Sequence, residues 1–246
     1  KRAESDKILI EYVSSNPTGP LHVGHGRGAA FGSVLSSILR ATGNDVDEEY
    51  YVNDQGRQIE ILSLSVWLRY LMIFNQINLF PNNCYQGTYV VELAEELKRD
   101  YGEKFSITKE IEDQISQMLQ LDMEEEALDG LISQSKEALN ESFDEIKSFV
   151  LNRILKNIEG DLKDFGVKHN SWFKESTMFR ADKDKTPLIN KALDSLEAKK
   201  QLYEKDGALW FKSTDFGDAK DRVVKRENGA TTYFASDIAY HANKYD

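Results

Sequence analysis

Two short apolar runs near the N-terminus are separated by a segment with helical periodicity. Residues 8–13 are rich in apolar side chains, which is typical of a buried strand, and residues 46–52 form a second candidate. Between them, residues 22–42 predict a helix, and Gly43 is a typical stop signal. The apolar face of this helix consists of Val34, Leu35, Ile38 and Leu39. A strand, a helix and a strand within about 45 residues predict a βαβ unit and therefore a parallel sheet.

A long stretch of helical pattern follows the second strand. Residues 58–78 are spaced for one helix, and residues 89–165 are almost entirely helical in pattern. An apolar stripe closes this stretch and comprises Phe143, Ile146, Val150, Ile154, Ile158, Leu162 and Phe165. We interpret residues 59–165 as a mostly helical insertion that interrupts an α/β domain.

The strand pattern returns after the insertion. Residues 171–173 are a short strand candidate, and residues 187–200 predict a helix. Two turn dipeptides, Asp206-Gly207 and Asn228-Gly229, each separate two apolar runs and predict hairpins. The runs they join are residues 202–204 with 208–211, and residues 222–226 with 231–234. A last helix pattern begins near Ser236.

The predicted fold class is therefore α/β, a Rossmann-like parallel sheet with a helical insertion. Residues 1–58 form its first part, residues 59–165 form the insertion, and residues 166–246 return to the sheet. At 246 residues with 40% hydrophobic side chains, the chain is long enough to bury a sizeable core.

The charge of the chain is concentrated in the insertion. Between residues 92 and 161 there are 19 acidic and 8 basic residues, which account for the whole net charge of −11. An acidic surface repels a phosphate backbone, so the insertion is a poor surface for holding nucleic acid. The neutral remainder of the chain can still hold phosphate at a local site.

Cysteine content and hydropathy restrict the cellular setting. Cys84 is the only cysteine, so the chain can form neither an internal disulfide nor a cysteine-based zinc site. No run of 18 apolar residues predicts a membrane span, and the first residues lack the apolar segment of a signal peptide. These features favour a cytoplasmic protein without a membrane partner.

The segment His22-Val23-Gly24-His25 carries the most specific chemical signal. It follows a strand and a loop rich in proline and glycine, and it opens a helix, whose N-terminus favours phosphate. Histidines three residues apart point the same way, so both can donate to phosphate oxygens. Gly24 removes a side chain, so that a flat base can lie against the backbone. The chemistry expected here is stabilisation of charge on a phosphate under attack.

Two other interpretations of the histidines compete with phosphate binding. They could be capping or core histidines, which is the usual role of a lone histidine. They could also ligate zinc, but a third ligand such as Cys84, His169 or His241 has no suggestive spacing.

Three segments together resemble a known family. Residues 10–25 resemble the signature of class I aminoacyl-tRNA synthetases in the form of the bacterial arginyl-tRNA synthetases, and residues 50–58 and 233–241 are also similar to that family. The resemblance implies that ATP and L-arginine form arginyl-adenylate, and that the arginyl group then passes to the 3′ end of tRNA(Arg). It implies Mg²⁺ with ATP and no metal bound by the protein itself.

The resemblance also implies roles for individual residues. His22 and His25 contact the ATP phosphates as catalytic residues, and Gly24 lies near the adenine. Asn16 and Glu11 lie near the α-amino end of arginine. The guanidinium pocket is formed by Glu175, Tyr233 and Asp237.

The chemistry of arginine supports such a pocket independently. A guanidinium has five donors in a planar fork and stays protonated, so a pocket that selects it needs carboxylates. Tyr233 and Asp237 are four residues apart and could face one pocket if a strand ends between them. Viewed alone, Tyr233 would be a half-buried strand aromatic, Asp237 a charge at a helix N-terminus, and Glu175 a solvated surface acid.

Two positions depart from the family pattern. Lys174 stands where a glycine is common, and Gly19 stands where some members carry a lysine. That lysine can replace a phosphate-binding lysine loop that lies later in the chains of family members. This sequence contains neither the lysine nor the loop. We therefore interpret the chain as a catalytic-domain fragment that ends before the lysine loop and the anticodon-binding domain, with weak or no activity on its own. The full-length protein would supply the contacts to tRNA(Arg).

Two other classes of function remain open from the residues. Small nucleotidylyltransferases and related amino-acid ligases share the fold and the histidine motif, although the guanidinium carboxylates argue against them. A non-catalytic adenylate-binding or interaction module would use the acidic helices as its contact surface. Titration with arginine and ATP would separate these classes.

Overall fold

The N-terminal part of the chain is a βαβ unit. The computed structural model describes residues 5–120, 125–181 and 186–245. Strand β1 (Lys7–Glu11) leads through helix α1 (Val23–Ala41) to strand β2 (Asp45–Val52), and the two strands pair in parallel with Ile8 opposite Val46. Gly43 follows α1 with a φ of 99°, so the predicted helix stop is confirmed.

Helix α1 packs on the sheet through its small residues. Its buried positions are Ala29, Gly32 and Ser36, and a Cβ built on Gly32 would lie 2.2 Å from Cγ of Tyr12. The predicted apolar face points elsewhere, since Val34 and Ile38 are 58% and 56% exposed. The apolar face given by the periodicity is therefore not the packing face of α1, because the ring of Tyr12 leaves room only for small residues there.

Replacing Gly32 by alanine is expected to destabilise the fold by about 1–3 kcal/mol, because the new methyl group overlaps the half-buried ring of Tyr12. Urea unfolding would measure this change. Gly28→Ala in the same helix is the matched control, since a Cβ there meets nothing within 4 Å. That substitution should leave stability unchanged or increase it by up to about 1 kcal/mol. Equal stability of the two variants would show that Tyr12 moves away freely.

Strand β2 serves two layers because its side chains alternate between the faces of the sheet. Glu48 accepts hydrogen bonds from Tyr12 Oη at 2.7 Å and from Arg40 of α1. The next residue, Glu49, accepts from Tyr240 Oη at 2.6 Å on the opposite face. Tyr240 belongs to helix α8 (Tyr233–Asn243), so α1 and α8 lie on opposite faces of β2.

Strand β3 (Ser171–Lys174) completes the parallel sheet in the order β1-β2-β3. It pairs in parallel with β2, with Tyr50 opposite Trp172 and the two rings stacked 4.3 Å apart. The predicted α/β fold with a parallel sheet is therefore confirmed. Residues from 53 to 170 separate β2 from β3, so the sheet is interrupted as the sequence predicted.

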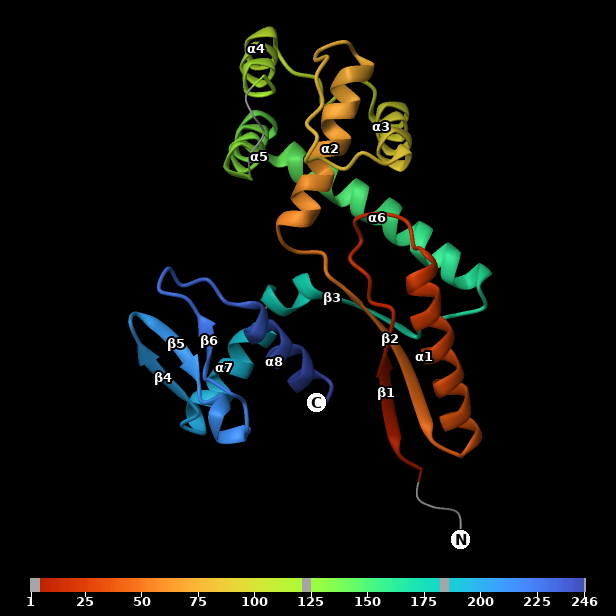
Figure 1. Cartoon of the computed structure of the whole chain (residues 1–246), viewed down its shortest axis with the longest axis vertical. Coiled ribbons are helices and arrows are strands. Elements are labelled where there is room, and N and C mark those ends of the chain that lie inside the picture. The colour runs from red at the N-terminus through yellow and green to blue at the C-terminus, as the bar shows by residue number, and fades with distance from the viewer. Residues whose placement is uncertain (1–4, 121–124, 182–185, 246) are drawn as a thin grey trace.

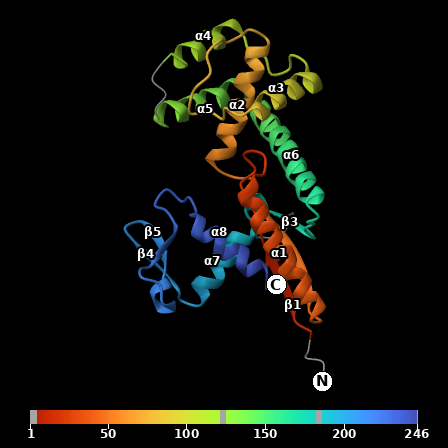
Figure 2. The same ribbon diagram turned by 45° about the vertical axis from the view of Figure 1, so that its right-hand side comes forward.

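Every regular element described within the interruption is a helix. Its helices are α2 (Arg57–Ile73), α3 (Thr88–Tyr101), α4 (Lys109–Met118), α5 (Glu125–Leu139) and α6 (Glu141–Asp164). Figures 1 and 2 show α2 to α5 as a group at the end of the molecule far from the N-terminus, with α6 leading back to the sheet. Helix α2 is the centre of this group, and Trp67 and Tyr70 within it are fully buried.

Two predictions within this helical part need correction. Helix α2 ends at Ile73 rather than at residue 78, because Asn75 adopts a left-handed backbone with a φ of 56°. Phe165, the last residue of the predicted apolar stripe, is 58% exposed because it lies just beyond α6. The other stripe residues are buried.

The last part of the chain adds a second sheet. Strands β4 (Leu202–Lys205), β5 (Ala208–Phe211) and β6 (Arg222–Lys225) form an antiparallel sheet beside helix α7 (Leu188–Ala198). Short 3-10 helices, η1 (Glu175–Phe179) and η2 (Ser213–Phe216), follow β3 and β5. In both ribbon views α8 lies between the two sheets (Figures 1 and 2).

The predicted hairpin around Asn228-Gly229 is only partly present. Thr231 forms a single antiparallel bridge with Lys225, but residues 231–234 are not a strand. Thr232 caps α8, accepting a hydrogen bond from the backbone of Ala235, so the helix starts at Tyr233 instead of near Ser236. The strand prediction was wrong because a threonine that suits a strand also suits a helix N-cap.

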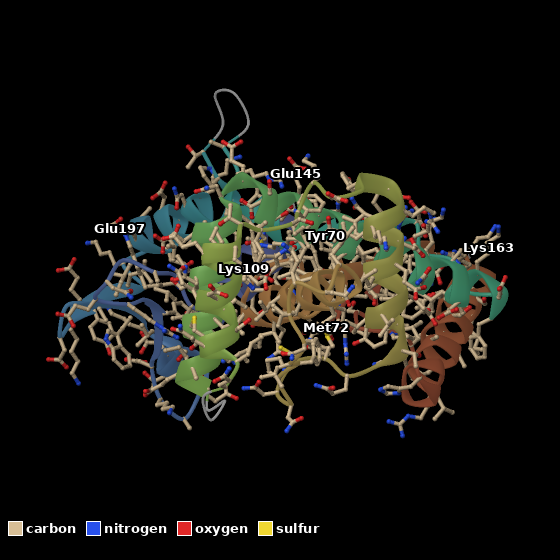
Figure 3. All side chains as sticks on the ribbon, turned by 90° about the horizontal axis from the view of Figure 1, so that it is seen from above. Tyr70, Met72, Lys109, Glu145, Lys163 and Glu197 are labelled. Atoms are coloured by element: carbon tan, nitrogen blue, oxygen red, sulfur yellow. The ribbon has the colours of Figure 1, made fainter. Side chains whose placement is uncertain are left out.

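The surface of the molecule carries both charged side chains and exposed apolar ones such as Phe31 and Ile38. Seen from above, charged side chains such as Lys163 and Glu197 extend at its two ends (Figure 3). In the part of the chain that is described, no helix is long and apolar enough to cross a membrane.

Candidate functional site

The candidate site lies where the parallel strands end. The carboxyl ends of parallel strands meet at one edge of a sheet, and ligands of open α/β sheets bind there. The loop after β1 leads to the N-terminus of α1, β2 leads to Asn53 and Asp54, and β3 leads to Glu175. Sequence segments far apart in the chain are thereby brought to one edge.

The two histidines of the motif form a reciprocal cap on α1. His22 is the N-cap residue, and its Nδ1 accepts from the backbone N–H of Gly24 at 3.1 Å. Nδ1 of His25 accepts from the backbone N–H of His22 at 3.2 Å. The rings are stacked with centroids 3.8 Å apart. The capping interpretation is therefore correct, and it concerns only the Nδ1 atoms.

This cap determines which nitrogen of each ring carries the proton. A neutral imidazole that accepts at Nδ1 has its proton on Nε2, so each ring keeps one Nε2–H donor. Burial and the neighbouring His22 hold the pKa of His25 below its usual value, so that ring is neutral at pH 7. The motif thus provides two donors at the positive end of the α1 dipole, an arrangement suited to an anion.

The structure gives a second reason for a glycine at position 24. A Cβ at this position would lie 3.0 Å from Cε1 of His22 and 3.1 Å from its Nδ1. These separations are tighter than ordinary contacts, so any side chain at position 24 would push the His22 ring from its capping position.

The loop that carries Asn16 has a strained backbone. Val13 and Ser14 have φ angles of 67° and 40°, a region that residues other than glycine rarely occupy. Ser14 Oγ accepts from the backbone N–H of Tyr51 at 3.0 Å, which ties the loop to β2. Asn16, which is exposed, then comes within 3.1 Å of Asn53, measured from its Oδ1 to Nδ2 of Asn53.

Glu175 is the centre of a cluster of acidic side chains, in which Glu175 and Asp54 are buried and Asp237 is exposed. Only 5% of the surface of Glu175 is exposed, as for Asp54, whose Oδ1 accepts from the backbone N–H of Ser176 at 2.8 Å. Burial raises the pKa of Glu175, the negative charges of Asp54 and Asp237 raise it further, and hydrogen bonds with Ser236 and Tyr51 oppose the rise. The idea of Glu175 as a solvated surface acid is therefore wrong. A buried carboxylate beside two others favours a bound cation.

Helix α8 also contributes to this acidic cluster. Tyr233 and Asp237 are one helical turn apart on α8, so they share a face without a strand ending between them. Tyr233 is 73% exposed, which excludes the half-buried strand aromatic, and its hydroxyl lies 3.7 Å from a Cβ built on Gly56. It therefore extends across the start of α2. Burial raises the pKa of Asp237, His241 lowers it, and Glu11 raises it.

Glu11 has a partner within the protein. Its Oε2 lies 3.3 Å from Nζ of Lys244, which lies 3.9 Å above the ring of Tyr240. The same tyrosine donates its hydroxyl to Glu49. Glu11 is therefore close to the acidic cluster, but Lys244 already neutralises part of its negative charge.

Three residues beside Glu175 have no role in the sequence-based predictions. They are Asn53, Asp54 and Tyr51. Asn53 and Asp54 follow a buried strand directly, and a polar pair at the carboxyl end of a parallel strand was the signal available. Burial raises the pKa of Tyr51, and the carboxylates of Glu175, Asp237, Asp54 and Glu11 raise it further. Its hydroxyl therefore stays protonated among acidic neighbours.

The zinc alternative receives no support from the residues described. Within residues 5–120, 125–181 and 186–245, no group of three or more histidine, cysteine, aspartate or glutamate side chains could hold a metal ion. His169 instead lies against aromatic rings, with its centroid 4.4 Å from that of Tyr12. Cys84 is buried, and burial raises the pKa of its thiol to about 11.

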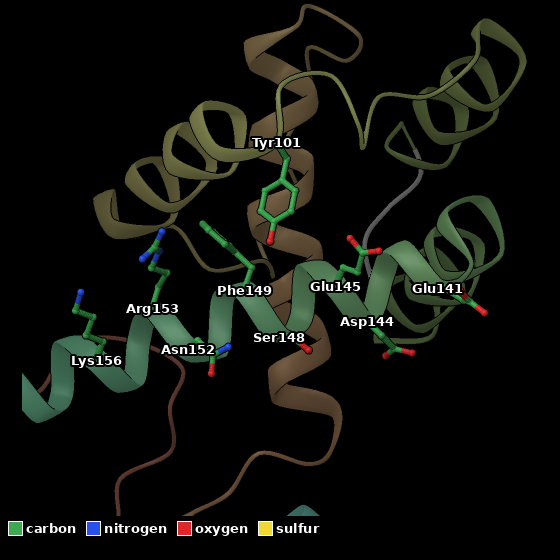
Figure 4. A pocket seen from close by; sticks show the side chains of 9 residues that line it. All are labelled: Tyr101, Glu141, Asp144, Glu145, Ser148, Phe149, Asn152, Arg153 and Lys156. Carbon is green, nitrogen blue, oxygen red and sulfur yellow. The ribbon is translucent and has the colours of Figure 1, made fainter.

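One cavity lies away from the strand ends. It has a volume of about 690 Å³ and follows α6, with acidic residues such as Glu141 at one end and basic residues such as Lys156 at the other (Figure 4). Glu145 pairs with Lys104, and Arg153 pairs with Asp100 at 2.6 Å. Several of its charges are therefore neutralised inside the protein, which makes it a weaker candidate.

A second cavity adjoins the histidine motif. It has a volume of about 580 Å³ and lies between the N-terminus of α1 and the end of α6. His22, Val23 and Arg27 line one side, and Leu162 and Phe165 line the other. The motif is therefore accessible from this side.

A parallel sheet with a helix N-terminus and a cluster of acidic residues at its carboxyl edge is typical of Rossmann-like folds. Comparison with known families gives the class. The model of the catalytic domain of class I (R) tRNA synthetases matches residues 1–246, and the chain belongs to this family.

Similar proteins have consistent names. An arginine–tRNA ligase of Nitrosomonas eutropha is 50% identical over 244 residues. The match covers 97% of this chain and 41% of that protein. One from Acinetobacter baumannii (strain AYE) is 47% identical over 253 residues, again covering 97% of this chain and 41% of the relative. The chain thus spans about two fifths of the length of these relatives.

Solved structures agree with the fold. An arginyl-tRNA synthetase of Campylobacter jejuni matches all of this chain and 46% of its own, with a TM-score of 0.77 and 32% identity. The Thermus thermophilus arginyl-tRNA synthetase matches 98% of this chain and 36% of its own, with a TM-score of 0.61. At 24% identity, the second match bears on the fold alone.

Proposed function

We propose that this chain is catalytic-domain sequence of an arginine–tRNA ligase, which activates L-arginine with ATP and transfers it to the 3′ end of tRNA(Arg). The observation that carries the proposal is the buried carboxylate of Glu175, set beside Asp54 and Asp237 at the edge where α1 begins. A cationic substrate relieves the repulsion among these acids, and a nucleotide phosphate suits the adjoining helix terminus.

The first step joins arginine to AMP. An oxygen of the arginine carboxylate attacks the α-phosphorus of ATP, the bond from that phosphorus to the bridging oxygen of the β-phosphate breaks, and pyrophosphate leaves. Negative charge grows on the phosphate oxygens during this step. His22 and His25 donate from Nε2 to those oxygens, and their capping bonds hold the rings in place before the reaction.

Recognition of arginine uses the acidic cluster. Glu175 and Asp237 accept hydrogen bonds from the guanidinium, Tyr233 covers the pocket from α8, and Asn16 and Glu11 lie toward the α-amino group. In the second step a terminal ribose hydroxyl of tRNA(Arg) attacks the arginyl carbonyl carbon, and AMP leaves with the bonding electrons.

Several components would come from outside the described residues. Mg²⁺ would enter with ATP and neutralise phosphate charge, and parts of the full-length protein would grip the tRNA, since the insertion is acidic. We place the reaction in the cytoplasm, where tRNA charging serves translation.

Isothermal titration with arginine, ATP and a non-hydrolysable arginyl-adenylate analogue tests the proposal. Tight binding of the analogue is expected. Nucleotide binding that is indifferent to arginine would favour a nucleotidylyltransferase, and no binding of any of the three would favour an interaction module. Arginine-dependent pyrophosphate exchange by the complete gene product gives the decisive activity.

Gly24→Ala is expected to lower the rate of pyrophosphate exchange about tenfold, because the methyl group displaces the His22 ring by a few tenths of an ångström. Exchange kinetics at saturating arginine would measure it. Gly28→Ala is the control, since it adds the same methyl group to the same helix in open space. Equal rates in both variants would mean that the position of the His22 ring is unimportant.

A further inference from the structure

A further cavity joins the helical insertion to the edge of the sheet where the candidate site lies. It has a volume of about 320 Å³, which is at the lower end of the range usual for small-ligand sites. Its walls are one face of α6, the residues Asp54 and Gln55 after β2, and the two residues that flank η1, Lys174 and Arg180. Asp54 also belongs to the acidic cluster around Glu175, so this cavity adjoins the proposed arginine site.

The spacing of residues along α6 determines which of its faces lines the cavity. Positions 144, 147, 148, 151 and 152 lie three or four residues apart in turn, so they share one face of the helix. Figure 4 shows Asp144, Ser148 and Asn152 extending from the side of α6 away from Tyr101. Lys147 lies on the same face and is half-buried, so it brings a base to the cavity although the insertion as a whole is acidic.

Three basic side chains line this cavity without an acidic partner. Within the part of the chain that the structure describes, Lys147, Lys174 and Arg180 form no ion pair. The larger cavity along α6 differs, since its Arg153 is paired with Asp100. Bases that have no carboxylate beside them are available to an anion that comes from outside the chain. We call this second space along α6 the basic cavity.

The composition of the basic cavity favours the phosphate and sugar of a nucleic acid. Its two acids are Asp144, which is exposed, and Asp54, whose Oδ1 already accepts a backbone hydrogen bond. Three bases outnumber them, and neutral donors come from Gln55, Ser148 and Asn152. Amide, hydroxyl and basic side chains are the groups that contact phosphate and sugar in nucleic-acid complexes. None of the described residues that line the cavity is aromatic, so the lining contains no ring on which a base would stack.

Lys174 makes the basic cavity a feature of this sequence. It stands where a glycine is common in the family, and it is exposed at the end of β3, directly before Glu175. A glycine at this position would leave two bases in the lining, equal in number to the acids. The positive charge beside the arginine site is therefore larger here than in members that carry the glycine.

We propose that Lys147, Lys174 and Arg180 bind the phosphates at the single-stranded 3′ end of tRNA(Arg) and thereby guide its terminal ribose to the arginyl group. This inference rests on the proposed function, because the transfer step requires that ribose to reach arginine beside the acidic cluster. An RNA backbone that enters through the basic cavity meets bases at the site, although the insertion around it carries the net negative charge of the chain.

The test compares intact tRNA(Arg) with tRNA(Arg) that lacks its single-stranded 3′ end. Fluorescence anisotropy of the complete gene product with each RNA gives two Kd values, and their ratio isolates the contribution of the 3′ end. The wild type is expected to bind the intact RNA about tenfold more tightly, because three pairs at the surface each contribute modestly. Replacing Lys147, Lys174 and Arg180 together by glutamine should lower this ratio to about two or less, while the Kd values for arginine and ATP stay the same.

Salt dependence gives a second measure of the same contact. Each phosphate that is neutralised on a single strand adds about 0.7 to the slope of log Kd against log salt concentration. The slope for intact tRNA(Arg) should therefore exceed that for the truncated RNA by about 2 in the wild type. The triple glutamine variant should show the same slope for both RNAs.

Further variants separate the basic cavity from charge in general. Asp144→Asn removes an acid from the lining and should raise the ratio, a direction that misfolding does not produce. Glutamine at Lys191, Lys199 and Lys220 together removes the same total charge at exposed positions outside the cavity, so the ratio should not change. Lys174→Gln alone should lower the ratio about twofold if the triple variant fails to fold.

The outcomes separate the role of the cavity from the proposed function. Loss of the ratio with unchanged arginine and ATP binding supports the role. An unchanged ratio in the triple glutamine variant, or an equal fall in the control outside the cavity, overturns it. Weaker ATP or arginine binding with an unchanged ratio also overturns it and assigns the bases to the smaller substrates. Failure of the wild type to bind tRNA(Arg) at all refutes the proposed function instead.

Discussion

Replacing His22 or His25 by alanine is expected to lower the rate of arginine-dependent pyrophosphate exchange about 10²- to 10³-fold, with little change in arginine affinity. Each substitution removes one Nε2–H donor from phosphate whose charge increases in the transition state, and loss of one such donor typically has an effect of this size. Exchange kinetics with purified complete gene product would measure the rate, and titration would measure arginine binding.

His22 caps α1 and is also proposed to donate to phosphate, so a control must separate capping from catalysis. Alanine removes both the cap on α1 and the donor, whereas His22→Asn keeps a good N-cap and removes only the donor. His22→Asn should therefore retain the thermal stability of the wild type and still be slow. Wild-type exchange by His22→Asn would reduce the motif to a helix cap.

Glu175→Gln is expected to weaken arginine binding by about 2–5 kcal/mol while ATP affinity stays the same. The substitution leaves the guanidinium with a neutral partner at a buried position, and Asp237→Asn, at an exposed position, should act in the same direction. Titration of each variant with arginine and ATP would give both affinities. Asp194→Asn, at an exposed position on α7, is a matched loss of one carboxylate and should change neither.

Glu175→Gln should also change the pH dependence of arginine binding. Burial and the charges of Asp54 and Asp237 raise the pKa of Glu175 in the empty pocket. A proton therefore competes with arginine, and affinity in the wild type should fall as pH is lowered through this raised pKa. The neutral glutamine does not titrate, so the part of the pH dependence due to this residue should disappear.

Stability provides an independent check on the same variant. A carboxyl group whose pKa is raised in the folded state opposes folding at pH values above that pKa, because it is ionised in an unfavourable place. At neutral pH and without ligand, Glu175→Gln should thus be no less stable than the wild type. A variant that loses both stability and arginine binding would indicate misfolding rather than lost recognition.

The fold was predictable because its signals are local. The apolar runs of β1 and β2, the helix between them and the stop at Gly43 each depend on a few neighbouring residues. The direction of the α1 apolar face was not predictable, because it depends on the ring of Tyr12, which lies on another element. Thr232 likewise suited both a strand and an N-cap, and only the tertiary structure decided between them.

The site was predictable in part for the same reason. The spacing of His22 and His25 at the start of one helix predicted a site, whereas nothing in the sequence indicated that Glu175 is buried. Its position depends on β3 pairing with β2 across the whole insertion. Asn53 lies beside both Asn16 and Glu175 only in the folded chain, since these residues belong to segments far apart in the sequence.

The alternation of side chains along β2 restricts how sequences of this kind can diverge. Glu48 bonds on the α1 side and Glu49 on the α8 side, so a single inserted or deleted residue within β2 would exchange the two faces. Tyr50, which is fully buried on the face of Glu48, would then move to the face of Glu49. Related sequences should therefore vary in length in the loops between α2 and α6 and keep the interval from Gly43 to Asp54 constant, so that gaps in an alignment map the two-sided packing of one strand.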